Sequence, residues 1–287
     1  MKIALAQISP VLGNPERNLK SHLDHIRKAT LAKASLIVFP ELSLTGYTLK
    51  DLAPELALNP RKSPVFKKLL EASRAIDLVF GFVEEAADEP GLVYNAAAYL
   101  SRGRILHIHR KVFLPTSGMF EEGRFFAAGR QFRPFNTARV KTGLLVCRDF
   151  LHYGSSYCHF AGGAGLIITI SAAPGRGIDE PQSQGFETSQ MWELMGQAVS
   201  FFSSAVVVYC NRVGYEDGAV FAGGSFIYSP FGKLVARLPY LEEDLAFIEV
   251  DLSEIGRARK SWPFRRDERP EVIWQSLEKI IRESHED

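Results

Sequence analysis

The sequence predicts an α/β fold in which helices are layered on mixed β-sheets. Six short apolar runs, several of them β-branched and bounded by Gly, Pro or Asn, are typical of buried strands. These runs are residues 3–6, 36–39, 78–83, 140–146, 166–170 and 205–209. Helical patterns separate some of the runs, whereas others follow one another directly as hairpins. This combination favours a layered α/β fold with mixed sheets.

Two segments have the periodicity of amphipathic helices. Asn14 is a suitable N-cap before Pro15 at the first helical position, and an apolar face at helical spacing follows. That face comprises Leu19, Leu23, Ile26 and Thr30. A second stripe at the same spacing comprises Met191, Met195, Ala198 and Phe202. Because such a stripe normally faces a core, we expect the second one to be buried as well.

Two hairpins are expected outside the helical segments. Residues 94–100 lead through Ser-Arg-Gly into residues 105–109, and residues 226–228 lead through Pro-Phe-Gly into residues 234–237. We expect residues 246–250 to add a further strand beside the second hairpin.

Composition limits the classes of protein that the chain can belong to. It has 287 residues, of which 46% are hydrophobic and 23% charged, and we find no linker or repeat, so we expect one domain over residues 1–287. The net charge of +1 with scattered basic residues argues against a nucleic-acid partner. No apolar stretch reaches membrane-spanning length, and the N-terminus has no signal-peptide pattern. We therefore expect a cytoplasmic protein with reduced thiols and no membrane partner.

Three expected strands are followed by a residue whose side chain could take part in catalysis. Glu41 follows the run 36–39, Lys111 follows the second strand of the first hairpin, and Cys147 follows the run 140–146. Taken one at a time, they are consistent with a solvent-facing carboxylate, a charged loop entry and a buried cysteine.

Taken together, the three residues suit acyl transfer. A thiol needs a base and a nearby positive charge to become a nucleophile. We expect Glu41 to take the thiol proton and Lys111 to favour the thiolate and then the oxyanion of the tetrahedral intermediate. The backbone N–H of Arg148, which follows the cysteine, is the natural second donor to that oxyanion.

These residues and their surroundings resemble the nitrilase, or carbon–nitrogen hydrolase, superfamily. The matching motifs are PELSLTGY (40–47), YNAA (94–97), HRKVFLPTSGMFEEGRFF (109–126), GLLVCRDF (143–150), NRVG (211–214) and GGSFIYSPFGK (223–233). The resemblance implies a four-layer αββα sandwich with two mixed β-sheets. It also implies a triad of Glu41, Lys111 and Cys147, no metal or organic cofactor, and a homodimer or larger homo-oligomer.

The resemblance also implies a second catalytic glutamate between the lysine and the cysteine. Glu121 and Glu122 are the candidates, and the aromatic-x-Glu pattern of the family favours Glu122. The sequence departs from the common pattern at Arg148-Asp149, which leans towards amides rather than nitriles as substrates. The Arg148 side chain is expected to shape the pocket or to pair with Asp149.

Several further residues are expected around the pocket. In the family, the loop that begins at Ala172 and extends to residue 180 lies beside the pocket, so Ala172 and Arg176 are candidates for substrate positioning. Arg176 could bind a substrate carboxylate, although solvation is the alternative for an exposed arginine. Tyr47, Phe120 and Phe125 are pocket walls or core residues.

Other polar residues have less specific patterns. Asn95 and Asn211 are expected to hold backbone near the site. The spacing of His152, Cys158 and His159 fits no usual zinc pattern, and residues 153–160 look like the start of a helix behind the nucleophile.

The expected function is that of an amidase that cleaves a small amide through a thioester. Local motifs are similar to the glutaminase portion of glutamine-dependent NAD synthetases. The chain shows no SGG-type pyrophosphate loop, so we expect it to act alone or to supply ammonia to a separate partner, and not to be a complete synthetase. The alternatives are nitrile hydrolysis, a Cys–His hydrolase that uses His152 or His159, and a non-catalytic binding subunit.

Overall fold

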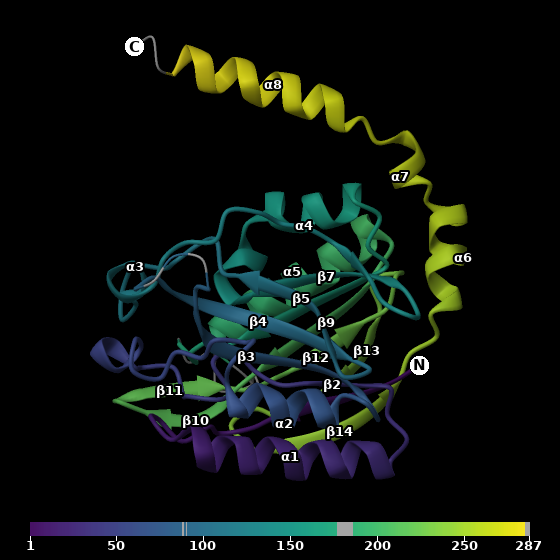
Figure 1. Cartoon of the computed structure of the whole chain (residues 1–287). Coiled ribbons are helices and arrows are strands. Elements are labelled where there is room, and N and C mark those ends of the chain that lie inside the picture. The colour runs from purple at the N-terminus through teal and green to yellow at the C-terminus, as the bar shows by residue number, and fades with distance from the viewer. Residues whose placement is uncertain (88, 90, 177–185, 285–287) are drawn as a thin grey trace.

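Two six-stranded sheets lie face to face at the centre of the molecule (Figure 1). The structure, a computed structural model, describes residues 1–87, 89, 91–176 and 186–284. In spatial order the first sheet contains β14 (Asp244–Glu249), β1 (Lys2–Gln7), β2 (Leu36–Val38), β3 (Asp77–Glu85), β4 (Val93–Ser101) and β5 (Arg104–Arg110). The second contains β13 (Leu234–Arg237), β12 (Phe226–Tyr228), β9 (Val206–Asn211), β8 (Leu166–Ser171), β7 (Lys141–Val146) and β6 (Phe135–Asn136). Both sheets combine parallel and antiparallel pairs, as expected.

Helices cover the outer faces of both sheets. Figure 1 shows α1 (Pro15–Leu31) and α2 (Pro64–Ala72) on one side of the sandwich, and α4 (Tyr153–Ala161) and α5 (Glu187–Ser203) on the other. Shorter elements are α3 (Glu122–Phe125), the 3₁₀ turns η1 (Lys50–Leu52) and η2 (Cys147–Leu151), and a small hairpin of β10 (Val213–Glu216) and β11 (Ala219–Ala222). The expected four-layer αββα sandwich is therefore confirmed.

Helix capping and apolar packing, both expected from the sequence, hold the predicted elements in place. Asn14 caps α1, because its side chain accepts a hydrogen bond from the backbone N–H of Arg17 at 3.0 Å. Leu19 and Ile26 on that helix are buried against the first sheet. One apolar cluster contains residues of both sheets, among them Leu5 of β1 and Val208 of β9. The interface between the sheets is thus a shared core.

Both expected hairpins are present, but the partner expected for residues 246–250 is wrong. β4 pairs with β5, and β12 with β13, in antiparallel fashion. β14, however, pairs antiparallel with β1 in the other sheet, with Lys2 opposite Glu249. The chain between β13 and β14 crosses from one sheet to the other, and strand periodicity carries no information about which sheet edge is free.

The expectation that the methionine stripe of α5 is buried is correct only for the middle of the stripe, where Met195 is partly buried and packs against the core. Met191 and Phe202 are 56% and 62% exposed. The buried face of α5 is displaced by one residue and includes Trp192 and Gly196. A Cβ at Gly196 would lie 2.4 Å from the Phe226 ring, so the close approach of the helix to the sheet depends on this glycine. The two ends of the apolar stripe, Met191 and Phe202, consequently face outwards.

The C-terminal segment follows the helical layer of the second sheet and then leaves it. It consists of α6 (Ser253–Ser261), α7 (Phe264–Asp267) and α8 (Pro270–Glu283). The ring of Phe264 packs against Phe201 and Phe202 of α5. α8 has no buried residue and extends away from the sandwich (Figure 1). Among the described residues, no helix combines the length and apolar character that a membrane crossing requires.

Candidate active site

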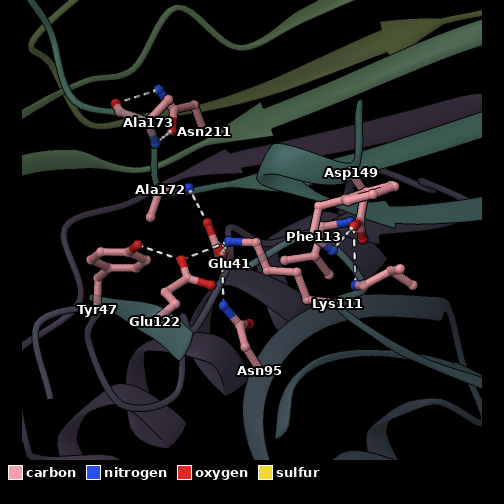
Figure 2. Close-up of polar contacts among 12 residues, drawn as sticks. Glu41, Tyr47, Asn95, Lys111, Phe113, Glu122, Asp149, Ala172, Ala173 and Asn211 are labelled. Atoms are coloured by element: carbon pink, nitrogen blue, oxygen red, sulfur yellow. Dashed lines mark hydrogen bonds and ion pairs between the residues drawn. The ribbon is translucent and has the colours of Figure 1, made fainter. Parts of the chain in front are cut away.

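Glu41 is held in a fixed orientation by three hydrogen-bond donors just beyond β2. Its Oε1 accepts from Asn95 Nδ2 and from Lys111 Nζ, both at 2.7 Å, and its Oε2 accepts from the backbone N–H of Ala172 at 2.7 Å (Figure 2). The turn after β2 passes so close to β3 that a Cβ at Gly81 would lie 2.2 Å from the backbone nitrogen of Leu42. Glycine at position 81 therefore lets this turn carry Glu41 into the interior.

Lys111 is fully buried and forms ion pairs with two carboxylates. Its Nζ lies 2.7 Å from Glu41 Oε1 and 2.7 Å from Glu122 Oε1. Burial by itself would lower the pKa of Lys111, but the charges of Glu122 and Glu41 outweigh burial and raise it. The ammonium form is therefore the stable one, which suits a group that has to stabilise negative charge.

Glu122 completes the buried charge cluster, whereas Glu121 does not belong to it. Glu122 Oε1 also accepts a hydrogen bond from the Tyr47 hydroxyl (Figure 2). Burial, and to a lesser degree the neighbouring charge of Glu41, raise the pKa of Glu122, although Lys111 acts in the opposite direction. Glu121 is exposed. The sequence-based choice of Glu122 thus agrees with the geometry.

Cys147 lies at a sharp turn where β7 ends and η2 begins. Its backbone φ is +45°, a strained value for a residue with a side chain. The side chain is nearly buried, with 6% exposure. Burial, followed by the charge of Glu41, raises the pKa of the Cys147 thiol to about 12, whereas Lys111 lowers it. The thiol therefore rests protonated and needs a base in order to react.

Asp149 connects the loop of Cys147 to the strand end that carries Lys111. Its Oδ1 accepts the backbone N–H groups of Val112 at 3.0 Å and Phe113 at 2.9 Å (Figure 2). Its Oδ2 accepts from His109 Nε2 at 2.8 Å. The expected pairing of Arg148 with Asp149 is therefore wrong, because the carboxylate oxygens accept their hydrogen bonds from backbone N–H groups and from His109.

The Arg148 side chain is exposed, so the expectation that it shapes the pocket has no support in the structure. The reason is local: η2 turns the side chain at position 148 outwards while it buries those of Cys147 and Asp149. The remaining candidate role of Arg148 is that of its backbone N–H, which follows the nucleophile and is the expected donor to the oxyanion.

Two expectations about residues next to the triad need correction. The N–H of Ala172 donates to Glu41, so this group positions the carboxylate and is not free to bind an oxyanion. Asn95 likewise binds the Glu41 carboxylate through its side chain and not only nearby backbone. Asn211 does hold backbone, because its Oδ1 accepts the N–H of Ala173 at 2.8 Å. The sequence placed Asn95 near the site but offered no signal for its contact with Glu41, nor for the contacts of Asp149 with the strand end of Lys111.

A row of side chains leads outwards from the charge cluster. The Tyr47 ring contacts Phe120 edge-on with centroids 6.2 Å apart, and Arg176 Cζ lies 5.7 Å from the centroid of Phe120. Tyr47 is buried, Phe120 half-buried and Arg176 exposed. Phe125 is also half-buried in the apolar cluster that contains Tyr47. The rest of the rim loop, residues 177–180, lies outside the described residues.

The histidines considered as alternative bases or ligands lie in other environments. His152 stacks on Phe113 with centroids 3.6 Å apart, and the buried His159 ring contacts Phe132 edge-on. Cys158 is on α4, the helix expected for this segment. In the part of the chain that the structure describes, no group of three or more His, Cys, Asp or Glu side chains could hold a metal ion.

The structure defines a class of fold and site: an αββα sandwich that buries a lysine between two glutamates, with the charges of Glu41 and Lys111 acting on the Cys147 thiol. Comparison with known families agrees with this class, because the model of the carbon–nitrogen hydrolase family matches residues 2–260. The chain therefore belongs to the carbon–nitrogen hydrolase family.

Individual relatives within this family differ in length. The chain is 32% identical to a glutamine-dependent NAD(+) synthetase of Acinetobacter baylyi over 282 residues, which cover 98% of this chain and 50% of the relative. It is 27% identical to a probable nitrilase of Schizosaccharomyces pombe, covering 96% and 98% of the two chains. A carbon–nitrogen hydrolase from Helicobacter pylori has the same fold, with a TM-score of 0.83, 24% identity and coverage of 96% and 98%. The chain thus spans about half of the synthetase and nearly all of the nitrilase.

Proposed function

We propose that the protein is an amidase that hydrolyses a small amide through a thioester on Cys147. The observation that carries this proposal is the buried Lys111 ammonium, which lies 2.7 Å from both Glu41 and Glu122. The charges of Glu41 and Lys111 both act on the thiol. This electrostatic influence supports a site in which Glu41 is the base, Lys111 the cation and Cys147 the nucleophile.

In the first half of the reaction the enzyme is acylated. Glu41 takes the proton of the Cys147 thiol as the sulfur attacks the amide carbon. Lys111 and the backbone N–H of Arg148 stabilise the oxyanion of the tetrahedral intermediate. When the C–N bond breaks, the amine leaves with the proton that Glu41 returns, and the acyl group remains on sulfur.

In the second half water replaces the amine. Glu41 removes a proton from water, and the hydroxide adds to the thioester carbon. The second oxyanion is stabilised by the same donors, and its collapse breaks the C–S bond. Sulfur regains the proton from Glu41, so that one amide and one water give one carboxylic acid and one amine or ammonia.

An ammonia-release screen tests the proposal directly. The panel comprises glutamine, other ω-amides, carbamoyl amines and simple nitriles. We expect release from at least one amide, and its loss in Glu41→Gln and Cys147→Ala. His152→Ala and His159→Ala should retain turnover, whereas the reverse pattern would favour a Cys–His hydrolase. Release from nitriles alone would favour nitrile hydrolysis, and no release at all would favour a binding subunit.

A second candidate is a glutaminase that supplies ammonia to a separate partner. The observation that favours it is the similarity to about half of a glutamine-dependent NAD(+) synthetase. On this reading glutamine is the preferred amide in the screen. A kcat/KM for glutamine no higher than for the other amides would argue against it.

We further propose that the protein forms a homodimer through the α4/α5 side of the sandwich. Met191, Leu194 and Phe202 are exposed on α5, and α8 exposes an apolar stripe that includes Trp274 and Leu277. The two helices, α5 and α8, lie on the same side of the sandwich (Figure 1). A second copy related by a two-fold axis would bury both surfaces of each chain at once.

A further inference from the structure

We propose that Ser171 is a hydrogen-bond donor to the sulfur of Cys147 when the thiolate forms. Ser171 is the last residue of β8, next to the strand that ends at the nucleophile. The inference deepens the proposed thioester chemistry and rests on it.

The first observation is an unsatisfied hydroxyl group. The side chain of Ser171 is fully buried, and among the residues that the structure describes its Oγ has no hydrogen-bond partner. The hydroxyls of Thr169 and Tyr209 nearby are in the same state. Leaving a buried polar group unpaired costs about 1–3 kcal/mol, so an unpaired group beside a reaction centre calls for an explanation.

The second observation is the register of the two strands. β7 and β8 run parallel, with Val146 opposite Ile170, so that the following residues, Cys147 and Ser171, are neighbours across the strand ends. Ser171 is still part of β8, whereas Cys147 already belongs to the turn η2, with a φ of +45°. The next residue, Ala172, donates its N–H to Glu41. At the end of β8, Ala172 therefore contacts the general base, Glu41, and the preceding residue, Ser171, is placed next to the nucleophile, Cys147.

The third observation is the electrostatic state of the thiol. Burial and Glu41 raise the pKa of Cys147, and the groups that lower it are Lys111 and the Ser171 hydroxyl. Lys111 is already engaged by two carboxylates, each 2.7 Å from its Nζ. A neutral O–H donor is therefore the natural additional partner for charge on sulfur, and such contacts often close only as the reaction proceeds.

Ser171 transfers no proton in this scheme. Its O–H turns towards Sγ while Glu41 holds the thiol proton, and it releases sulfur when the C–S bond forms. The same contact is available when sulfur leaves in the second half of the reaction. Its contribution is the difference between a hydrogen bond to a thiolate and one to a thiol.

The test compares Ser171→Ala with Thr169→Ala. Thr169 is the matched control, because it is equally buried, equally unpaired and two residues earlier on the same strand. The readout is the rate at which iodoacetamide alkylates Cys147 between pH 6 and 10, followed by peptide mass. We expect Ser171→Ala to slow alkylation about tenfold, which displaces the pH profile upwards by about one unit, as a charge-assisted hydrogen bond would. Thr169→Ala should follow the wild-type profile.

An alkylation profile of folded Ser171→Ala that matches the wild type would overturn the inference, as would an equal shift in Thr169→Ala. If Ser171→Ala does not fold, Ser171→Cys offers a weaker donor of similar shape, and the same peptide should show a smaller shift in the same direction. Alkylation requires no turnover. A protein that hydrolyses no amide but shows the Ser171 shift would therefore refute the amidase proposal and not the contact.

Discussion

Asp149 accepts a hydrogen bond from His109 at 2.8 Å, and each of the two residues is close in sequence to one of the reactive groups. Asp149 comes two residues after Cys147, and His109 comes two residues before Lys111. Both side chains are buried. The contact therefore sets the spacing between the loop of the nucleophile and the strand end of the lysine.

Replacement of Asp149 by Asn should impair this connection. The amide replaces one acceptor oxygen by an NH₂ donor. That donor then faces either the His109 ring N–H or the backbone N–H groups of Val112 and Phe113, and the corresponding hydrogen bonds are lost. We expect a loss of about 1–3 kcal/mol in unfolding free energy and a lower kcat. Thermal melting and steady-state kinetics measure both. Asp24→Asn, an exposed charge-matched change, should alter neither; unchanged kcat and melting in Asp149→Asn would show that the contact is dispensable.

Glu122 and Glu121 offer a matched pair of substitutions. Glu122→Gln removes a charge from the buried cluster around Lys111, and we expect kcat to fall by about 10²- to 10⁴-fold. Glu121→Gln changes an exposed side chain and should leave kcat within twofold of the wild type, roughly the scatter of such measurements. Equal effects of the two substitutions would remove Glu122 from the proposed machinery.

Sequence reasoning identified the residues that stand at strand ends. Glu41, Lys111 and Cys147 were predictable because each follows an expected strand, and Glu122 because a motif distinguished it from its neighbour. The structure brings the carboxylates and the ammonium of this set together. Their catalytic roles remain predictions.

Contacts that depend on tertiary approach were not predictable. Asn95 is the third residue of β4 and reaches Glu41 only because β4 is placed beside β3. The buried face of α5 was only partly identified because apolar residues occur on both sides of the helix, and the packed side is centred on Trp192 and Gly196, with Met195 at its margin. Periodicity identifies a helix more reliably than it identifies which of two apolar faces is buried.

His22 predicts a dependence of stability on pH. Burial lowers the pKa of His22 from 6.5 to about 3, although a hydrogen bond to the Asn18 carbonyl opposes the shift. Between these two values the unfolded chain holds a proton that the folded chain lacks, so stability falls as pH drops below 6.5. The expected contribution is about 1.4 kcal/mol per pH unit. Urea unfolding of His22→Gln at pH 7 and pH 5 should show a shallower decline than the wild type, whereas parallel declines would contradict this assignment.

The proposed homodimer predicts a concentration-dependent assembly. Phe202→Glu and Trp274→Glu place a charge on each of the two exposed apolar surfaces, and we expect each to shift the protein from dimer to monomer. Sedimentation equilibrium measures the shift, with Leu31→Glu, another exposed apolar position, as the control. A wild-type protein that is monomeric at all concentrations would refute the proposal and leave α8 free for a different partner.

The most direct test of the central claim is the mass of the protein during turnover. With an amide identified by ammonia release, acid-quenched wild-type protein should carry the acyl group of that substrate on the peptide of Cys147. Glu41→Gln should carry little or none, because the thiol keeps its proton. Ammonia release that persists in Cys147→Ala, or turnover without an acyl adduct in single-turnover samples, would contradict the account.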